Sequence, residues 1–175
     1  MSKIIAVIII LIALVFTGAG KVNAQNISGE SAWLKADQAQ EYFDFRVENL
    51  RNFLQKYNSP LAPYAEEFVI YADKNDLDYR LVPAITGVES TFGKRIPVKS
   101  YNAYGWANGE YKFTSWENSI EHVSGVLKDS YIDRGAVSIY QIAKRYAPPS
   151  TTWGGKVSFF VSKIDTLPLD FDIVI

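Results

Sequence analysis

The sequence contains no cysteine and only one histidine, His122, among its 175 residues. The absence of cysteine excludes disulfides, thiol catalysis and zinc or iron–sulfur sites with Cys ligands. A single histidine leaves a His-rich metal site or a His-based catalytic triad with almost nothing to build on. Any chemistry must therefore use carboxylates, hydroxyl groups and aromatic side chains, and we expect neither a metal nor a cofactor.

The sequence also has little excess charge of either sign. Its formal net charge is −1, so it lacks the basic footprint of a nucleic-acid-binding protein, and we expect no nucleic acid as a partner. The composition is 48% hydrophobic and 21% charged, which is ordinary for a folded globular chain. A chain of this length can bury one substantial core, which predicts a single globular domain.

The first 24 residues have the pattern of a secretory signal peptide. Lys3 precedes the apolar run 4–16, and Val22 and Ala24 supply the −3 and −1 positions of a cleavage site. The alternative is an uncleaved segment that tethers the chain to a membrane. In both cases we expect the rest of the chain to be exported, to the periplasm, the cell wall or the medium. A cysteine-free sequence suits an oxidising compartment.

Apolar residues at helical spacing predict that most of the remaining chain is α-helical. We expect a polar lead-in and an amphipathic helix over 25–57, a globular domain over 58–166 and a tail of unassigned structure over 167–175. The expected helices cover approximately residues 32–57, 61–74, 79–92, 114–127, 137–146 and 153–164.

The run from Tyr104 to Phe113 predicts a β-hairpin. Asn108-Gly109 lies between two alternating segments, a pattern typical of a two-residue type I′ turn. In that register four aromatic residues share one face: Tyr104, Trp106, Tyr111 and Phe113. They would either pack against the helices or form a stacking platform for sugar rings. The predicted fold class is therefore α-rich (α+β), a helical domain with a small β-hairpin lobe.

Glu89 is the carboxyl group best placed for chemistry. It lies beside the apolar stripe formed by Leu81, Ile85 and Val88 in the helix predicted over 79–92. Partial desolvation there would raise the pKa of its carboxyl group. A carboxylic acid that stays protonated near neutral pH can act as the general acid in cleavage of a glycosidic bond. The same pattern also fits a solvated glutamate at a helix end, which is the commoner situation.

Four segments of the chain contain short patterns that resemble those of one enzyme family. Residues 88–93, Val-Glu-Ser-Thr-Phe-Gly, match a Glu-Ser-x-aromatic-Gly pattern, and 101–106 contain an Asn-x-aromatic-Gly pattern. Residues 113–120 open the next predicted helix, and 145–149 contain a Tyr-Ala pair. In this order the segments resemble those of lysozyme-like peptidoglycan-cleaving enzymes, which include soluble lytic transglycosylases and bacterial endo-β-N-acetylglucosaminidases.

The resemblance implies a lysozyme-like helical domain, a small β-lobe and a cleft between them. It implies that the chain is a peptidoglycan glycosidase that cleaves a β-1,4 linkage of the glycan strand, with Glu89 as the general acid. Ser90 would support the site by hydrogen bonding. The residues that would bind the substrate along the cleft are Asn102, Tyr104, Trp106 and Tyr146.

The product of the reaction is left open. A hydrolase usually needs a second carboxylate, and Glu110, on the opposite face of the predicted hairpin from the aromatic residues, is the candidate. A lytic transglycosylase works with one carboxyl group and leaves a 1,6-anhydro end. The alternative function is a catalytically silent module with the same fold that binds cell-wall glycan or assists assembly.

Overall fold

A computed structural model describes residues 44–164 of the chain. The predicted signal peptide (1–24), the beginning of the 25–57 segment and the predicted tail (167–175) lie outside the described residues. Contacts between residues divide the chain between Phe43 and Asp44. Every element described below belongs to the second of these two units.

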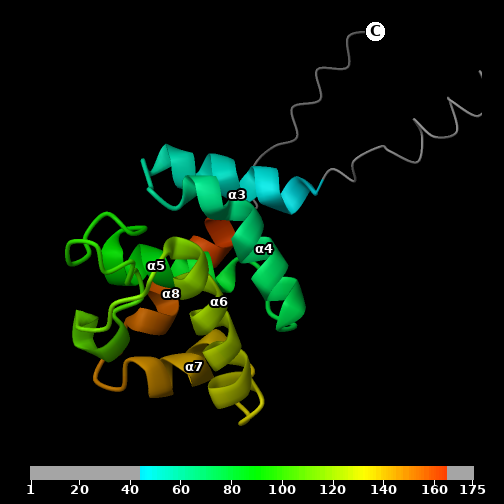
Figure 1. Ribbon diagram of the computed structural model, residues 1–175. Coiled ribbons are helices and arrows are strands. Elements are labelled where there is room, and N and C mark those ends of the chain that lie inside the picture. Colours follow the sequence, from blue (N-terminus) through cyan, green and yellow to red (C-terminus); the bar gives the residue numbers. More distant parts are fainter. Residues whose placement is uncertain (1–43, 165–175) are drawn as a thin grey trace, which may run out of the picture. The chain divides into compact units, whose positions relative to one another are not determined.

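The described residues form six α-helices connected by turns (Figure 1). They are α3 (Phe45–Lys56), α4 (Ala65–Lys74), α5 (Leu81–Ser90), α6 (Trp116–Val126), α7 (Ile139–Tyr146) and α8 (Trp153–Ile164). Two short 3₁₀ segments are η1 (Ala62–Tyr64) and η2 (Trp106–Gly109), and a π-helical segment, η3 (Leu127–Ile132), continues α6. Each α-helix falls within a segment predicted to be helical, so the helical part of the prediction is confirmed.

The predicted β-hairpin is wrong, and with it the α+β fold class. Residues 44–164 contain no strand, and their fold is all-helical. Where the hairpin was expected, the chain turns through η2. Ala107, Asn108 and Gly109 all have positive φ, at 50°, 56° and 87°, so the left-handed stretch includes the predicted Asn108-Gly109 turn and begins one residue before it.

The physical reason for this difference is the side chain of Asn102, which precedes the predicted hairpin. Its Nδ2 donates to the carbonyl oxygens of Trp106 (2.9 Å) and Tyr111 (3.1 Å). A buried side-chain amide therefore binds both segments that flank the turn. In a hairpin with Ala107 opposite Glu110, Trp106 and Tyr111 would form a non-hydrogen-bonded pair whose carbonyl groups point away from each other. Here both carbonyl groups converge on one amide, an arrangement that the hairpin does not allow.

Helix α5 is the centre of the core. Seven of its ten residues are buried, and it packs along α8 and contacts α6 (Figure 1). The helix begins at Leu81, two residues later than predicted. Pro83 therefore falls in the first turn, where the missing N–H costs no helical hydrogen bond.

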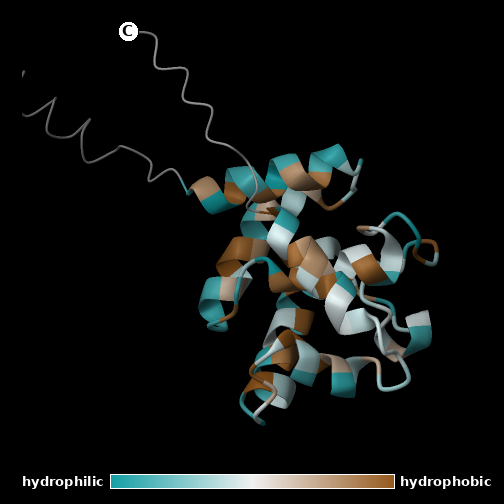
Figure 2. Ribbon diagram, turned by 180° about the vertical axis from the view of Figure 1, so that it is seen from behind, coloured by the Kyte–Doolittle hydropathy of each residue, from teal (hydrophilic) through white to brown (hydrophobic). Residues whose placement is uncertain are grey.

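Helix α3 buries one apolar face. Leu50, Phe53 and Leu54 are buried, while the rest of the helix is largely hydrophilic (Figure 2). Arg46 forms ion pairs with Asp44 at 2.6 Å and with Asp73 of α4 at 2.7 Å, which links the start of α3 to its neighbour. No helix within residues 44–164 is long and apolar enough to cross a bilayer.

Candidate active site

The site is built around Glu89, in the last turn of α5. Directly after this helix Thr91, Phe92 and Gly93 all have positive φ, so the chain reverses sharply. This reversal leaves the end of α5 next to the loop that begins at Asn102. Glu89 is partly buried there, and its side chain points toward that loop and toward α8.

Ser90 joins the end of α5 to the loop. Its hydroxyl group donates to the carbonyl oxygen of Ala103 at 2.8 Å and accepts from the backbone N–H of Gly93 at 2.9 Å. All three groups are buried, so loss of the hydroxyl would leave a donor and an acceptor without partners. The structure thus places Ser90 behind Glu89, where it fixes the backbone on both sides of the carboxyl-bearing residue.

Trp153, the first residue of α8, donates a hydrogen bond to Glu89. Its indole Nε1 lies 2.6 Å from Oε1 of the carboxyl group. Burial raises the pKa of Glu89 above its ordinary value of 4.5, and the hydrogen bond from Trp153 opposes that shift. The net direction is upward, so this carboxyl group holds its proton at a higher pH than a solvated glutamate does.

Gly105 lies against the other oxygen of the same carboxyl group. A Cβ atom at this position would be 2.8 Å from Oε2 of Glu89, closer than real Cβ contacts come. The residue also has φ of +66°, in the left-handed region that favours glycine. Both the backbone conformation and the space beside Glu89 therefore require glycine here.

Tyr146, the last residue of α7, completes the surroundings of Glu89. Its hydroxyl group donates to the carbonyl oxygen of Tyr104 at 2.6 Å, and its ring stacks on Trp153 with centroids 4.9 Å apart. Burial and then the negative charge of Glu89 are the main reasons why the pKa of Tyr146 lies well above its ordinary value. The tyrosine therefore stays protonated and holds the loop and α8 in place around the carboxyl group.

The other predicted substrate-binding residues occupy the loop that faces Glu89. Asn102 is buried and organises this loop from inside, and its Oδ1 also accepts from the backbone N–H of Trp106 at 3.0 Å. The side chain of Tyr104 is fully buried and packs against Phe113, so only its backbone reaches Tyr146. Trp106 is partly buried, with its ring edge-on to His122.

Glu110, the predicted second carboxylate, lies exposed at the end of η2. Its side chain makes no hydrogen bond or ion pair with another described residue. The influences that shift the pKa of Glu89 are burial and the Trp153 hydrogen bond, with no carboxylate from residues 44–164 among them. In this part of the chain Glu89 is therefore a single carboxyl group without an electrostatically coupled acidic partner.

Sequence reasoning missed the roles of Trp153 and Gly105. Trp153 follows the Tyr-Ala pair by several residues, and the segment between them contains two prolines, so spacing alone does not direct its indole toward Glu89. Gly105 belongs to the Asn-x-aromatic-Gly pattern, and that glycine was the available signal of a close backbone approach.

No protein-family model matches this chain, and no curated protein matches it significantly. Across residues 44–164, no group of three His, Cys, Asp or Glu side chains is arranged to hold a metal ion. The chemistry of the site around Glu89 is therefore the basis for a functional proposal.

Proposed function

We propose that this protein cleaves the glycan strand of bacterial peptidoglycan at a β-1,4 linkage, with Glu89 as the general acid. The observation that carries the proposal is the arrangement at the end of α5. A partly buried carboxyl group with a raised pKa lies between the indole N–H of Trp153 and the backbone of Gly105. A general acid needs its proton near the working pH, and burial provides this for a glutamate.

The two oxygens of Glu89 have different surroundings, which assigns the proton to one of them. Oε1 accepts the hydrogen bond from Trp153 at 2.6 Å. An indole N–H only donates, so Oε1 is best left unprotonated. Oε2, on the Gly105 side, then carries the proton that is transferred to the glycosidic oxygen.

The reaction that follows from this arrangement needs one carboxyl group. Glu89 donates its proton to the glycosidic oxygen, the bond from that oxygen to the anomeric carbon breaks, and the leaving sugar departs as an alcohol. The anomeric carbon, now oxocarbenium-like, is attacked by a hydroxyl group whose proton passes to the Glu89 carboxylate. This last transfer restores the acid.

The attacking hydroxyl group belongs either to water or to the 6-position of the same sugar. Because no described acidic residue is coupled to Glu89, the second route is favoured, since it does not need a separate carboxylate to position a water molecule. The product end is then a 1,6-anhydro sugar. The proposed substrate lies outside the cytoplasmic membrane, in agreement with the export expected from residues 1–24.

The test is incubation of the full chain with purified peptidoglycan, followed by mass spectrometry of the soluble fragments. Three variants accompany it: Glu89→Gln, Glu110→Gln and, as a matched exposed control on α4, Glu66→Gln. We expect anhydro ends, which are lighter by one water than reducing ends. Glu89→Gln should lower the rate by about 10²–10⁴-fold, the usual contribution of a general acid.

The other outcomes separate the alternatives. Reducing ends that disappear in Glu110→Gln would assign a two-carboxylate hydrolysis. Absence of fragments from the unsubstituted chain, with the glycan still bound, would overturn the enzymatic proposal and leave a glycan-binding module.

A further inference from the structure

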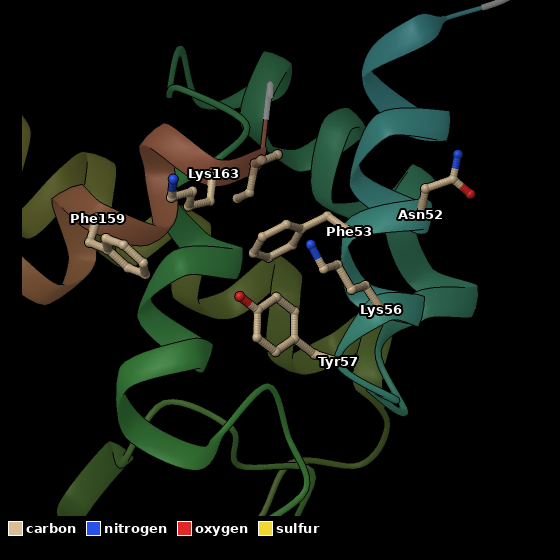
Figure 3. A pocket seen from close by; sticks show the side chains of 7 residues that line it. Asn52, Phe53, Lys56, Tyr57, Phe159 and Lys163 are labelled. Atoms are coloured by element: carbon tan, nitrogen blue, oxygen red, sulfur yellow. The ribbon is translucent and has the colours of Figure 1, made fainter. Parts of the chain in front are cut away.

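Two hollows lie side by side along the exposed side of α8. The first, of about 510 Å³, lies between α5 and α8 and includes Val88, Lys156, Phe159 and Phe160 in its lining. The second, of about 300 Å³, lies between α3 and α8 and includes Phe53, Lys56, Tyr57, Phe159 and Lys163 (Figure 3). Both hollows are lined by Phe159, so they lie next to each other on either side of this side chain, and the two together are called the α8 groove below.

The first hollow begins beside the candidate active site. Val88 immediately precedes Glu89 on α5, and Thr152, another lining residue, immediately precedes Trp153. A polymer bound at the Glu89 carboxyl group would therefore lie close to the start of the α8 groove. A side branch of that polymer that points toward α8 would enter the groove. The groove is not occupied by another described segment of the chain, since Phe159 is 53% exposed.

The lining of the groove selects an acidic ligand with apolar parts. Its floor is aromatic and aliphatic, and its charged residues are all lysines: Lys56, Lys156 and Lys163. No acidic residue from the described part of the chain lines either hollow. Figure 3 shows the amine of Lys56 and the hydroxyl of Tyr57 pointing into the space between α3 and α8. The amine of Lys163 lies 5.5 Å from the ring centroid of Phe159.

We propose that the α8 groove binds the peptide stem of peptidoglycan while the glycan strand lies at Glu89, an inference that rests on the proposed function. Stems are short peptides that combine free carboxylates with small apolar side chains, which matches lysines above an apolar floor. Their length also fits. From Thr152 to Lys163 the helix rises roughly 17 Å at 1.5 Å per residue. An extended peptide of about five residues covers that distance at 3.3 Å per residue.

The test compares two soluble substrates: uncross-linked glycan strands with their stems, and the same strands after an amidase has removed the stems. The variant reverses two charges of the groove, Lys56→Glu with Lys156→Glu. A matched control reverses two exposed lysines elsewhere, Lys99→Glu with Lys144→Glu. The measured quantity is the ratio of kcat/KM on stem-bearing strands to kcat/KM on stripped strands.

We expect this ratio to fall about tenfold in the groove variant, because two attractions to carboxylates become repulsions of modest size at exposed positions. The control should keep the ratio of the unsubstituted chain. An unchanged ratio in the groove variant would overturn the proposal, as would an equal fall in the control.

A binding measurement keeps the inference separate from the proposed function. The full chain, isotopically labelled, is titrated with a synthetic stem pentapeptide that carries no sugar, and the backbone amide signals are followed by NMR. Shifts concentrated at Gly155, Lys156 and Phe159 would support the groove even if neither glycan substrate is cleaved, an outcome that would refute only the proposed function. Shifts confined to other regions, or no shifts at millimolar peptide, would overturn the groove assignment.

Discussion

Replacing Trp153 with phenylalanine tests the hydrogen bond that acts on the proton affinity of Glu89. The substitution keeps an aromatic ring to stack on Tyr146 and removes the indole donor, which lies 2.6 Å from Oε1. That hydrogen bond stabilises the ionised carboxylate and lowers its pKa, against the larger effect of burial. Its removal should therefore raise the pKa of Glu89 further above 4.5.

The size of the shift follows from the difference between two hydrogen bonds. A bond to a charged group is worth about 1.5–3 kcal/mol, and a bond to a neutral group about 0.5–1.5 kcal/mol. The carboxyl group accepts from Trp153 in both protonation states, so only the difference, about 1–1.5 kcal/mol, changes its titration. One pKa unit corresponds to about 1.4 kcal/mol, so the expected rise is about one unit.

The assay is a ¹³C NMR titration of the Glu89 carboxyl carbon in the full chain. Trp116→Phe is the matched control, because Trp116 is also a buried tryptophan at the start of a helix and has Tyr101, not Glu89, as its aromatic neighbour. An unchanged or lowered pKa in Trp153→Phe would refute the reasoning. An equal rise in Trp116→Phe would attribute the effect to loosened packing and not to the lost donor.

Gly105→Ala should lower the rate of glycan cleavage at least tenfold, because the added Cβ would displace the carboxyl group of Glu89. The control is Gly109→Ala, where φ is also positive but no atom lies within 4 Å of the added Cβ, and it should leave the rate unchanged. Ser90→Ala should lower the free energy of unfolding by about 1–3 kcal/mol in urea denaturation, since two buried backbone groups lose their partner. Ser124→Ala, which removes a buried hydroxyl with no described partner, should cost much less. Because the pKa of Glu89 is raised in the folded state, its contribution to stability is present below pH 4.5 and is lost as the pH rises through the raised value. The stability of Glu89→Gln relative to the unsubstituted chain should therefore increase over that pH range, and parallel stability–pH curves would contradict the assigned burial.

The helices were predictable because each buries one apolar stripe. Leu50 and Leu54 of α3, and Ile120 and Val123 of α6, lie on stripes that are visible in the sequence and are buried in the structure. The absence of the hairpin was not predictable from the local pattern, since Asn108-Gly109 satisfies the usual preference for a hairpin turn. The deciding contacts come from Asn102, outside the turn, whose side chain binds the carbonyl groups on both sides.

The candidate site was likewise predictable from the sequence only in part. The position of Glu89 at the edge of an apolar stripe fitted both a partly buried carboxyl group and a solvated one at a helix end, and the structure has this residue partly buried with a raised pKa. Its partners come from distant parts of the chain, since Trp153 lies 64 residues away in sequence. Local spacing carries no information about such a contact, so the indole donor and the close approach of Gly105 were found only in the three-dimensional arrangement.

The most direct test of Glu89 as the general acid is the pH dependence of kcat/KM for glycan cleavage, measured for the unsubstituted chain and for Trp153→Phe. Because kcat/KM reports the pKa values of the free protein, it should fall as the pH rises, with a midpoint equal to the NMR-measured pKa of Glu89. In Trp153→Phe that midpoint should move upward together with the measured pKa. An alkaline limb that stays in place while the pKa of Glu89 moves, or cleavage that survives in Glu89→Gln, would contradict the assignment.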